Sequence, residues 1–302
     1  MTSDELQKTE EIALKIRRLV FEHTIKNNGG YLSQAASSAD FLAALYSKIL
    51  NLGKSIAPDM PLAYAGNPSS MNKNYTTGAL YHGEKKDEYD RFFVSPAHYA
   101  LVIYAALIAV GRMNEKALDL FNKDGSSVEM IGAEHSPGME VTNGSLAQTL
   151  SMASGVAFAR RVKKEKGRVW VFISDGEFQE GQTWETFLTM GHYNLNNMAV
   201  IADMNGQQCD GAVHTVMQIG DVEQKLRAFG ANVMTVDGHN IKEIYRASEI
   251  KPYNGPLVIL ANTSPWRGMN ALKKRYPRLH YVRFKSEAEK QNLKEEISKQ
   301  LY

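Results

Sequence analysis

Polar residues with the chemistry of a metal site follow three apolar runs of strand length in this sequence. The three groups are Asp175-Gly176-Glu177, Asp203-Met204-Asn205 and Asp237-Gly238-His239. Mg²⁺ prefers carboxylate, amide and carbonyl oxygens, together with water and substrate phosphate. We therefore expect Asp175 and Asn205 to be metal ligands, with the backbone carbonyl of Gln207 completing the protein's share.

The first of these groups also suits a phosphate, because glycine lets the backbone approach one closely. Gly176, Gly181 and Thr183 match the register of a P-loop, but Gln182 stands where its lysine would be. Two glutamates in the same loop, Glu177 and Glu180, would repel a triphosphate. No Gly-x-Gly-x-x-Gly follows any apolar run, so neither a P-loop nor a dinucleotide site is supported.

The elements that must position these residues alternate along the chain. Apolar runs predict strands at 92–94, 169–173, 198–202, 232–236 and 256–260. Helical patterns are expected at 98–110, 146–166, 184–192, 222–228 and 241–248. This alternation predicts an α/β fold, a doubly wound and mainly parallel sheet with helices on both faces. Ligands of such sheets bind at the carboxyl ends of the strands, so the three polar groups are expected to converge on neighbouring strands.

The two ends of the chain add further helices. Residues 4–27 have helical spacing that Gly29-Gly30 stops, and a second helix is expected to start near Asp40. The stretch 53–86 is rich in Pro, Gly, Asn and Ser, and a loop of that length is expected to be functional or to lie at an interface. Near the end, Ser286 to Glu289 predicts a capping box. The following stripe of Leu293, Ile297 and Leu301 would pack on this chain or on a partner.

Composition narrows the classes of function. Hydrophobic residues make up 43% and charged residues 23% of the 302 positions, as in a protein with a real core. A formal net charge of +2 gives no argument for nucleic acid or membrane binding. Cys209 is the single cysteine, which excludes an internal disulfide and a cysteine metal cluster. The polar start and the lack of an apolar run of roughly 20 residues favour a cytoplasmic protein.

Several ordered motifs give the chain a family resemblance. Asp175-Gly176, Glu180-Gly181 and Asn205 together resemble the thiamine diphosphate motif of the transketolase family. Similar blocks are Ile16-Arg17-Arg18, Ser38-Ala39-Asp40, Asp90-Arg91-Phe92 with His98, Pro137 to Leu146, Asp237-Gly238-His239 and His280. The resemblance therefore extends over nearly the whole chain.

The resemblance implies the cofactors thiamine diphosphate and Mg²⁺. It makes Asp175, Asn205 and Gln207 the metal ligands. The residues implied to bind the cofactor are Gly144, Ser145, Leu146, Gly176, Glu177, Asn205 and His135. An ordinary loop histidine is the alternative for His135.

The resemblance also assigns the reacting end of the site. His98 and His280 would face the substrate, and Glu180 would lie at a subunit interface, coupled to a glutamate of the partner. Tyr31 stands where the family usually has a substrate-contacting histidine, and a phenol cannot carry a proton near neutral pH as imidazole does. Ala147 and Thr149 likewise replace two glycines near the cofactor. These replacements favour a non-standard ketose, with lost activity as the alternative.

By the same resemblance, residues 1–302 form a single diphosphate- and metal-binding domain. The pyrimidine-binding and C-terminal domains would lie on a second subunit, in an α2β2 assembly. The implied reaction is transfer of a two-carbon ketol unit from a ketose to an aldose, on sugar or sugar phosphate substrates. Two alternatives stay open: the alpha-type subunit of a 2-oxo acid decarboxylase or dehydrogenase, and a non-catalytic regulatory subunit. The basic residues between Arg267 and Arg283 would bind an anion or a partner, or form a solvated face.

Overall fold

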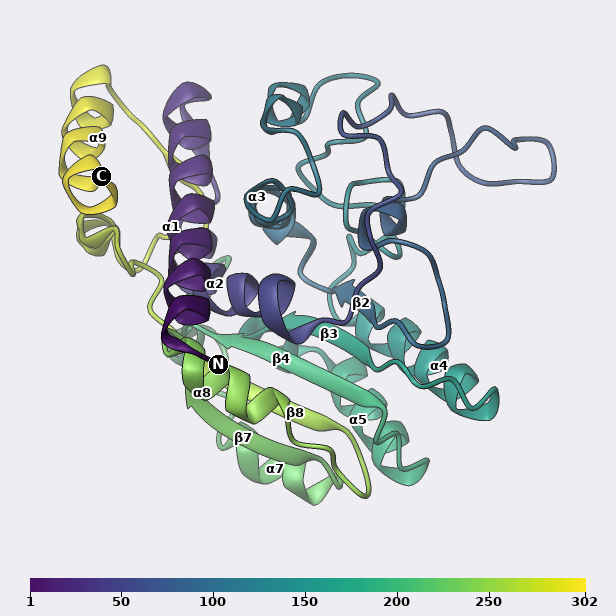
Figure 1. Cartoon of the computed structure of the whole chain (residues 1–302). Coiled ribbons are helices and arrows are strands. Elements are labelled where there is room, and N and C mark those ends of the chain that lie inside the picture. Colours follow the sequence, from purple (N-terminus) through teal and green to yellow (C-terminus); the bar gives the residue numbers. More distant parts are fainter.

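The core of the protein is one parallel sheet, seen in a computed structural model that describes residues 1–302 (Figure 1). Its five strands, in spatial order, are β2 (Arg91–Val94), β3 (Val169–Ser174), β4 (Met198–Met204), β8 (Leu257–Asn262) and β7 (Asn232–Asp237). Every neighbouring pair is parallel. The predicted α/β class and all five predicted strands are confirmed.

Both faces of the sheet are covered, which explains the continuous apolar runs of the strands. One face packs against α4 (Gln148–Val162), α5 (Gly181–His192) and α7 (Val222–Ala228). The other packs against α1 (Ser3–Lys26), α2 (Leu32–Ala44), α3 (Ala100–Ala109) and α8 (Ile241–Ser248). Alternate residues of β3 serve the two cores: Trp170 and Phe172 point to the α1 side, and Val171 points to the α4 side.

The strand order corrects one expectation about the polar strand ends. β3 and β4 are neighbours, with Ser174 paired to Asp203, so Asp175 and Asn205 emerge side by side. β8 lies between β4 and β7, however, so the third polar group is one strand further away. Asp237 is exposed there and does not join the other two groups.

Several helix boundaries also differ from the sequence pattern. The helix expected at 98–110 begins as a 3-10 turn, Ala97–Tyr99, before α3. The helix expected at 146–166 is shorter at both ends. The second helix starts at Leu32, so Asp40 lies in its later half, and it continues as a π-helical turn, Leu45–Ile49.

The C-terminal helix packs on this chain. In α9 (Glu287–Leu301) the stripe Leu293, Ile297 and Leu301 is buried, and α9 runs beside α1 in Figure 1. Ser286 caps the helix by accepting from the backbone N–H of Glu289. The Glu289 carboxylate accepts from the N–H of Lys285 instead of that of Ser286, so the predicted capping box is only half formed.

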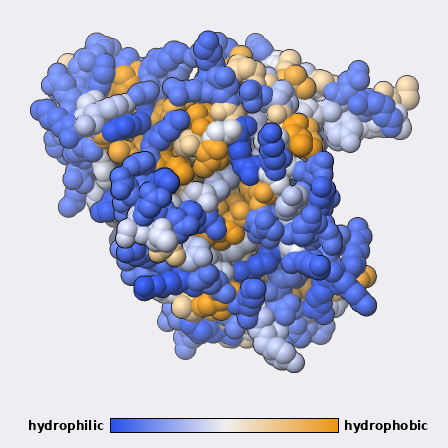
Figure 2. Space-filling view, viewed as in Figure 1, coloured by the Kyte–Doolittle hydropathy of each residue, from blue (hydrophilic) through white to orange (hydrophobic).

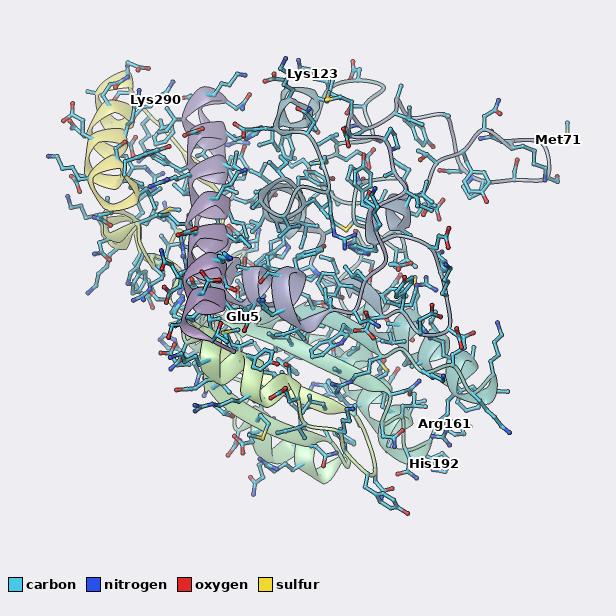
Figure 3. All side chains as sticks on the ribbon, viewed as in Figure 1. Glu5, Met71, Lys123, Arg161, His192 and Lys290 are labelled. Atoms are coloured by element: carbon cyan, nitrogen blue, oxygen red, sulfur yellow. The ribbon has the colours of Figure 1, made fainter.

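The long segment after α2 has little regular structure. Apart from a 3-10 helix at Gly78–His82, residues 53–86 are irregular, with a few bends and one isolated bridge, Ala63 with Ser126. Part of this segment projects from the body, with Met71 at its tip (Figure 3). The face shown in Figure 2 is mostly hydrophilic, with hydrophobic residues gathered in its middle. None of the helices combines the length and the apolar character that spanning a bilayer requires.

Candidate functional site

A cavity of about 280 Å³ lies beyond the carboxyl ends of β3 and β4. Most of the residues predicted to act border it: His98, Gly144, Leu146, Gly176, Glu180, Asn205, Gln207 and His280. A second cavity of about 260 Å³ is lined by Asp175, Gly206, His214 and Asn262, among others. The turn at residues 205–207 thus contributes to both cavities.

Asp175 is the buried carboxylate of the site, and its side chain is incompletely satisfied. It follows β3 in a 3-10 turn, Asp175–Gln179, and is 2% exposed. Its Oδ2 accepts a hydrogen bond from the N–H of Gly206 at 2.6 Å, while its Oδ1 has no partner. Burial, reinforced by the nearby Asp203, raises the pKa of Asp175 well above its usual range. A cation beside Oδ1 would satisfy this orphaned oxygen.

The amide of Asn205 has a fixed orientation. Its Nδ2 donates to the hydroxyl of Tyr99 and to Asp203, both at 3.1 Å. Its Oδ1 accepts from the N–H of Gln207 at 2.8 Å. Asp175 and Asn205 therefore hold two successive backbone amides of one turn, which places their oxygens around the same backbone.

These residues fit a divalent cation and a phosphate group. The cation would take Oδ1 of Asp175 and Oδ1 of Asn205, both oxygen ligands of the kind that Mg²⁺ prefers. No Lys or Arg lines either cavity, so the linings contribute no lysine or arginine charge that could balance a phosphate. A Cβ at Gly176 would meet no protein atom closer than Gln208 at 3.5 Å. The missing side chain at Gly176 leaves space on the cavity side, where a diphosphate would lie.

The structure brings Tyr31, His98 and His280 together, although they are far apart in sequence. The ring centroids lie 4.8 Å apart for His98 and His280, 5.6 Å for Tyr31 and His280, and 6.0 Å for Tyr31 and His98. Burial and the neighbouring His280 lower the pKa of His98 to about 3. Burial also lowers the pKa of His280 and raises the pKa of Tyr31. At neutral pH all three side chains are uncharged hydrogen-bonding groups.

His280 was predicted from the sequence, but the residues that position it, in the first turn of α2, were not. Ser33 Oγ donates to the carbonyl of Leu279 at 2.7 Å, and Gln34 Nε2 donates to the carbonyl of His280 at 3.1 Å. Gly29 and Gly30 pair with Arg283 and Val282 in a small antiparallel sheet. These contacts hold two segments that are 246 positions apart along the chain.

The loop before α4 borders the cavity through Gly144 and Leu146. Ala147 at its end has φ +66°, a left-handed conformation that favours glycine. This agrees with the glycine that the sequence motif leads one to expect there. Ala147 donates its backbone N–H to Glu177 at 3.0 Å.

Three predicted cofactor-binding residues do not line the cavity. Glu177 is fully buried and accepts from Ser95, from Ala147 and from the backbone and hydroxyl of Ser174. Both carboxylate oxygens of Glu177 accept hydrogen bonds within the chain, so Glu177 ties the end of β3 to Ser95 and to the loop before α4. Ser145 is exposed outside the lining. His135 lies against Glu129 and the ring of Tyr64.

Glu180 is exposed at the cavity rim, and no hydrogen bond to its side chain is found in the chain. Other cavity residues came without a sequence prediction: Ser33, Gln34, Ala97, Tyr99, Ile131, Ser174, Gln179, Gln208 and Cys209. Gln208 and Cys209 follow Asn205 closely in sequence. Their position after a predicted strand could therefore have identified them as cavity residues. Tyr99 lies in the 3-10 turn before α3, and nothing in the sequence pattern there predicts a cavity residue.

Comparisons with known proteins show which family this chain resembles. The family model described as "Transketolase, thiamine diphosphate binding domain" matches residues 35–264. A putative uncharacterized transketolase family protein of Sinorhizobium fredii is 32% identical over 277 residues, covering 90% of this chain and 89% of that protein. A 6-deoxy-6-sulfo-D-fructose transketolase subunit of a Clostridium species is 30% identical, covering 84% and 83%. An apulose-4-phosphate transketolase subunit of Actinobacillus succinogenes is 27% identical, covering 93% and 92%.

Solved structures show the same fold. The transketolase of Campylobacter jejuni superposes with a TM-score of 0.71 at 21% identity, covering 99% of this chain. This chain spans 47% of that transketolase, or about half its length. With a family model that matches most of its residues, the chain belongs to the transketolase family and carries that family's thiamine diphosphate-binding domain.

Proposed function

We propose that this chain binds thiamine diphosphate with Mg²⁺ and, together with a second subunit, transfers a two-carbon ketol unit from a ketose to an aldose. The observation that carries the proposal is the pair of oxygens at the strand ends. Asp175 Oδ1 is buried without a partner, and Asp175 and Asn205 accept from two successive backbone N–H groups of the 205–207 turn.

Charge balance is the reason for including a cation in the proposal. A diphosphate placed at Gly176 would stand near Asp175 and Asp203, with no Lys or Arg in the cavity linings. Bringing those negative charges together in a buried site is costly without a counter-charge. Asp175 and Asn205 would hold a Mg²⁺ ion, which would supply that charge, and the carbonyl of Gln207 in the same turn would be the protein's third ligand.

The chain's own residues would then handle the substrate. Bound thiamine diphosphate supplies the electron sink of the reaction through its ylid. His98 and His280, neutral at physiological pH, would donate and accept hydrogen bonds with the sugar's carbonyl and hydroxyl groups. Tyr31, which packs against both rings, keeps its proton and would restrict the space around them.

Two further points support a two-subunit enzyme on an unusual sugar. Relatives of similar length are named as subunits, for 6-deoxy-6-sulfo-D-fructose and for apulose-4-phosphate. Glu180 stands exposed at the cavity rim, available to a partner's side chain. An anionic end of the ketose finds no Lys or Arg in the cavity, so we assign its recognition to the second subunit.

The test is a calorimetric titration of thiamine diphosphate with and without Mg²⁺, using the chain co-expressed with its partner. We expect Mg²⁺-dependent binding that is lost in Asp175→Ala, because that variant lacks the carboxylate ligand. Asp237→Ala is the matched control, since it removes an exposed carboxylate from another strand end.

If the wild type and Asp237→Ala bind the cofactor and Asp175→Ala does not, the next step is to compare turnover of ketose donors with turnover of 2-oxo acids. Equal binding by Asp175→Ala would contradict the proposed metal site. Turnover of 2-oxo acids without ketose turnover would contradict ketol transfer.

A further inference from the structure

Asp203 is a fully buried carboxylate that lies behind the cavity wall, outside its lining. Four side chains donate hydrogen bonds to it: Ser37 at 2.6 Å, Tyr99 at 2.8 Å, Asn205 at 3.1 Å, and Thr263. These donors come from α2, from the 3-10 turn before α3, from β4's own end and from the residue after β8. So many converging donors hold the carboxylate rigidly in one place.

The Asp203 carboxylate accepts from all four of these donors, and this fixes which way the Asn205 amide points. The amide nitrogen, and not its oxygen, must face Asp203. The Tyr99 hydroxyl donates its proton to Asp203 and accepts a second hydrogen bond from the same nitrogen. The nitrogen of Asn205 therefore faces this side, and its Oδ1 faces the 206–207 backbone, where it accepts from the N–H of Gln207.

We propose that Asp203 is the positioning residue of the metal site, which locks the Asn205 amide with its oxygen toward the cation. The inference rests on the proposed function, in which Asn205 is a ligand of Mg²⁺. Without this acceptor, only the N–H of Gln207 would still hold the amide in its orientation, and an amide that turned over would present its NH₂ group to the cation, which cannot bind it. Partners that orient metal ligands in this way typically contribute about tenfold to a hundredfold in metal affinity.

The position of Asp203 is itself secured by a second set of contacts. Thr263, which donates to Asp203, is followed by Ser264, whose N–H donates to His239 Nε2 at 2.8 Å. His239 Nδ1 in turn contacts Asp40 of α2 at 2.8 Å. The strand end after β8 is thereby tied to the same helix that supplies Ser37.

The test uses the isosteric variant Asp203→Asn in the assembled two-chain enzyme. Mg²⁺ is titrated calorimetrically at saturating thiamine diphosphate, which measures binding independently of turnover. We expect about tenfold to a hundredfold weaker Mg²⁺ binding. Asp124→Asn is the matched control: it makes the same substitution at an exposed carboxylate outside both cavity linings, so Mg²⁺ affinity should stay within about twofold of the wild type.

A second variant distinguishes loss of the Asn205 orientation from a general disruption of the metal site. In the exchange variant Asp203→Asn with Asn205→Asp, the new carboxylate presents an oxygen to the cation in either orientation, at unchanged total charge. We expect it to recover most of the lost affinity. If Asp203→Asn fails to fold, Tyr99→Phe, which removes one of the two acceptors of the Asn205 nitrogen, replaces it and should also weaken Mg²⁺ binding.

Wild-type affinity in the folded Asp203→Asn or Tyr99→Phe variant would overturn the positioning role while leaving the proposed function intact. An exchange variant as weak as Asp203→Asn would overturn it too. Absence of Mg²⁺-dependent cofactor binding in the wild type would overturn the proposed function and this inference together.

Discussion

At the residue scale, Ala147 shows a local cost beside the site. Its φ of +66° costs a non-glycine residue roughly 1–2 kcal/mol in the folded state. Glycine would avoid this strain, but part of the gain would be offset because glycine makes the unfolded chain more flexible. We expect Ala147→Gly to stabilise the protein by up to about 1 kcal/mol in denaturant unfolding. Ala159→Gly is the control, because that exposed position in α4 is helical and should lose about 1 kcal/mol. Destabilisation by both variants would show that the Ala147 side chain contributes more packing than strain.

His23 gives a pH dependence whose sign is set by burial. It is 7% exposed in α1 against Phe121, and burial lowers its pKa to about 4 from 6.5. The unfolded chain therefore binds a proton first as the pH falls, so stability is full above about pH 6.5 and is lost toward pH 4. The loss attributable to His23 is at most about 3 kcal/mol.

We expect His23→Gln to flatten the fall in unfolding free energy between pH 6.5 and 4, measured by urea denaturation. His192→Gln, at an exposed position, should leave the slope unchanged. The comparison is between variants because burial also lowers the pKa values of His82, His98 and His280, which contribute their own acid dependence. Equal slopes for His23→Gln and the wild type would contradict this assignment.

At the element scale, α9 is part of the core. Ile297 is fully buried, and Arg18 of α1 donates to the carbonyl of Leu301 at 2.6 Å. Ile297→Ala should destabilise the protein by about 2–5 kcal/mol, as is usual for emptying a core site. Glu295→Ala, on the exposed face of the same helix, should change stability by less than about 0.5 kcal/mol. A small effect of Ile297→Ala would mean that α9 is only weakly docked on α1.

How much the sequence predicts also differs between elements. The buried strands were predictable because both faces of the sheet are covered, as at Val169 to Ile173. The start of α3 was not, because Ala97 to Tyr99 is apolar enough for a helix while its backbone forms a 3-10 turn that places His98 and Tyr99. In the site, Asp175 and Asn205 follow from strand ends. Ser33 and Gln34 could not be found, because their contacts with residues 279–280 arise from tertiary packing.

At the scale of the whole molecule, the segment between Gly53 and Thr77 stands apart from the two cores. It has no helix or strand, and its apolar side chains include Leu62 at 56% and Met71 at 92% exposure. Figure 3 shows Met71 at the end of this projection. Exposed, irregular loop tips of this kind are preferred sites of proteolytic nicking. Lys73, exposed near the tip, is therefore the expected first site of trypsin cleavage.

Such a nick should leave the molecule assembled. Helices α1 and α2 precede the projection, while α3 and all five strands of the sheet follow it, and they share one hydrophobic cluster. Fragments 1–73 and 74–302 are therefore expected to co-elute in gel filtration and to separate only under denaturing conditions, with mass spectrometry locating the cut. Lys73→Gln should delay cleavage. A first cut within a helix, or fragments that dissociate on nicking, would contradict a cohesive core that bridges the projection.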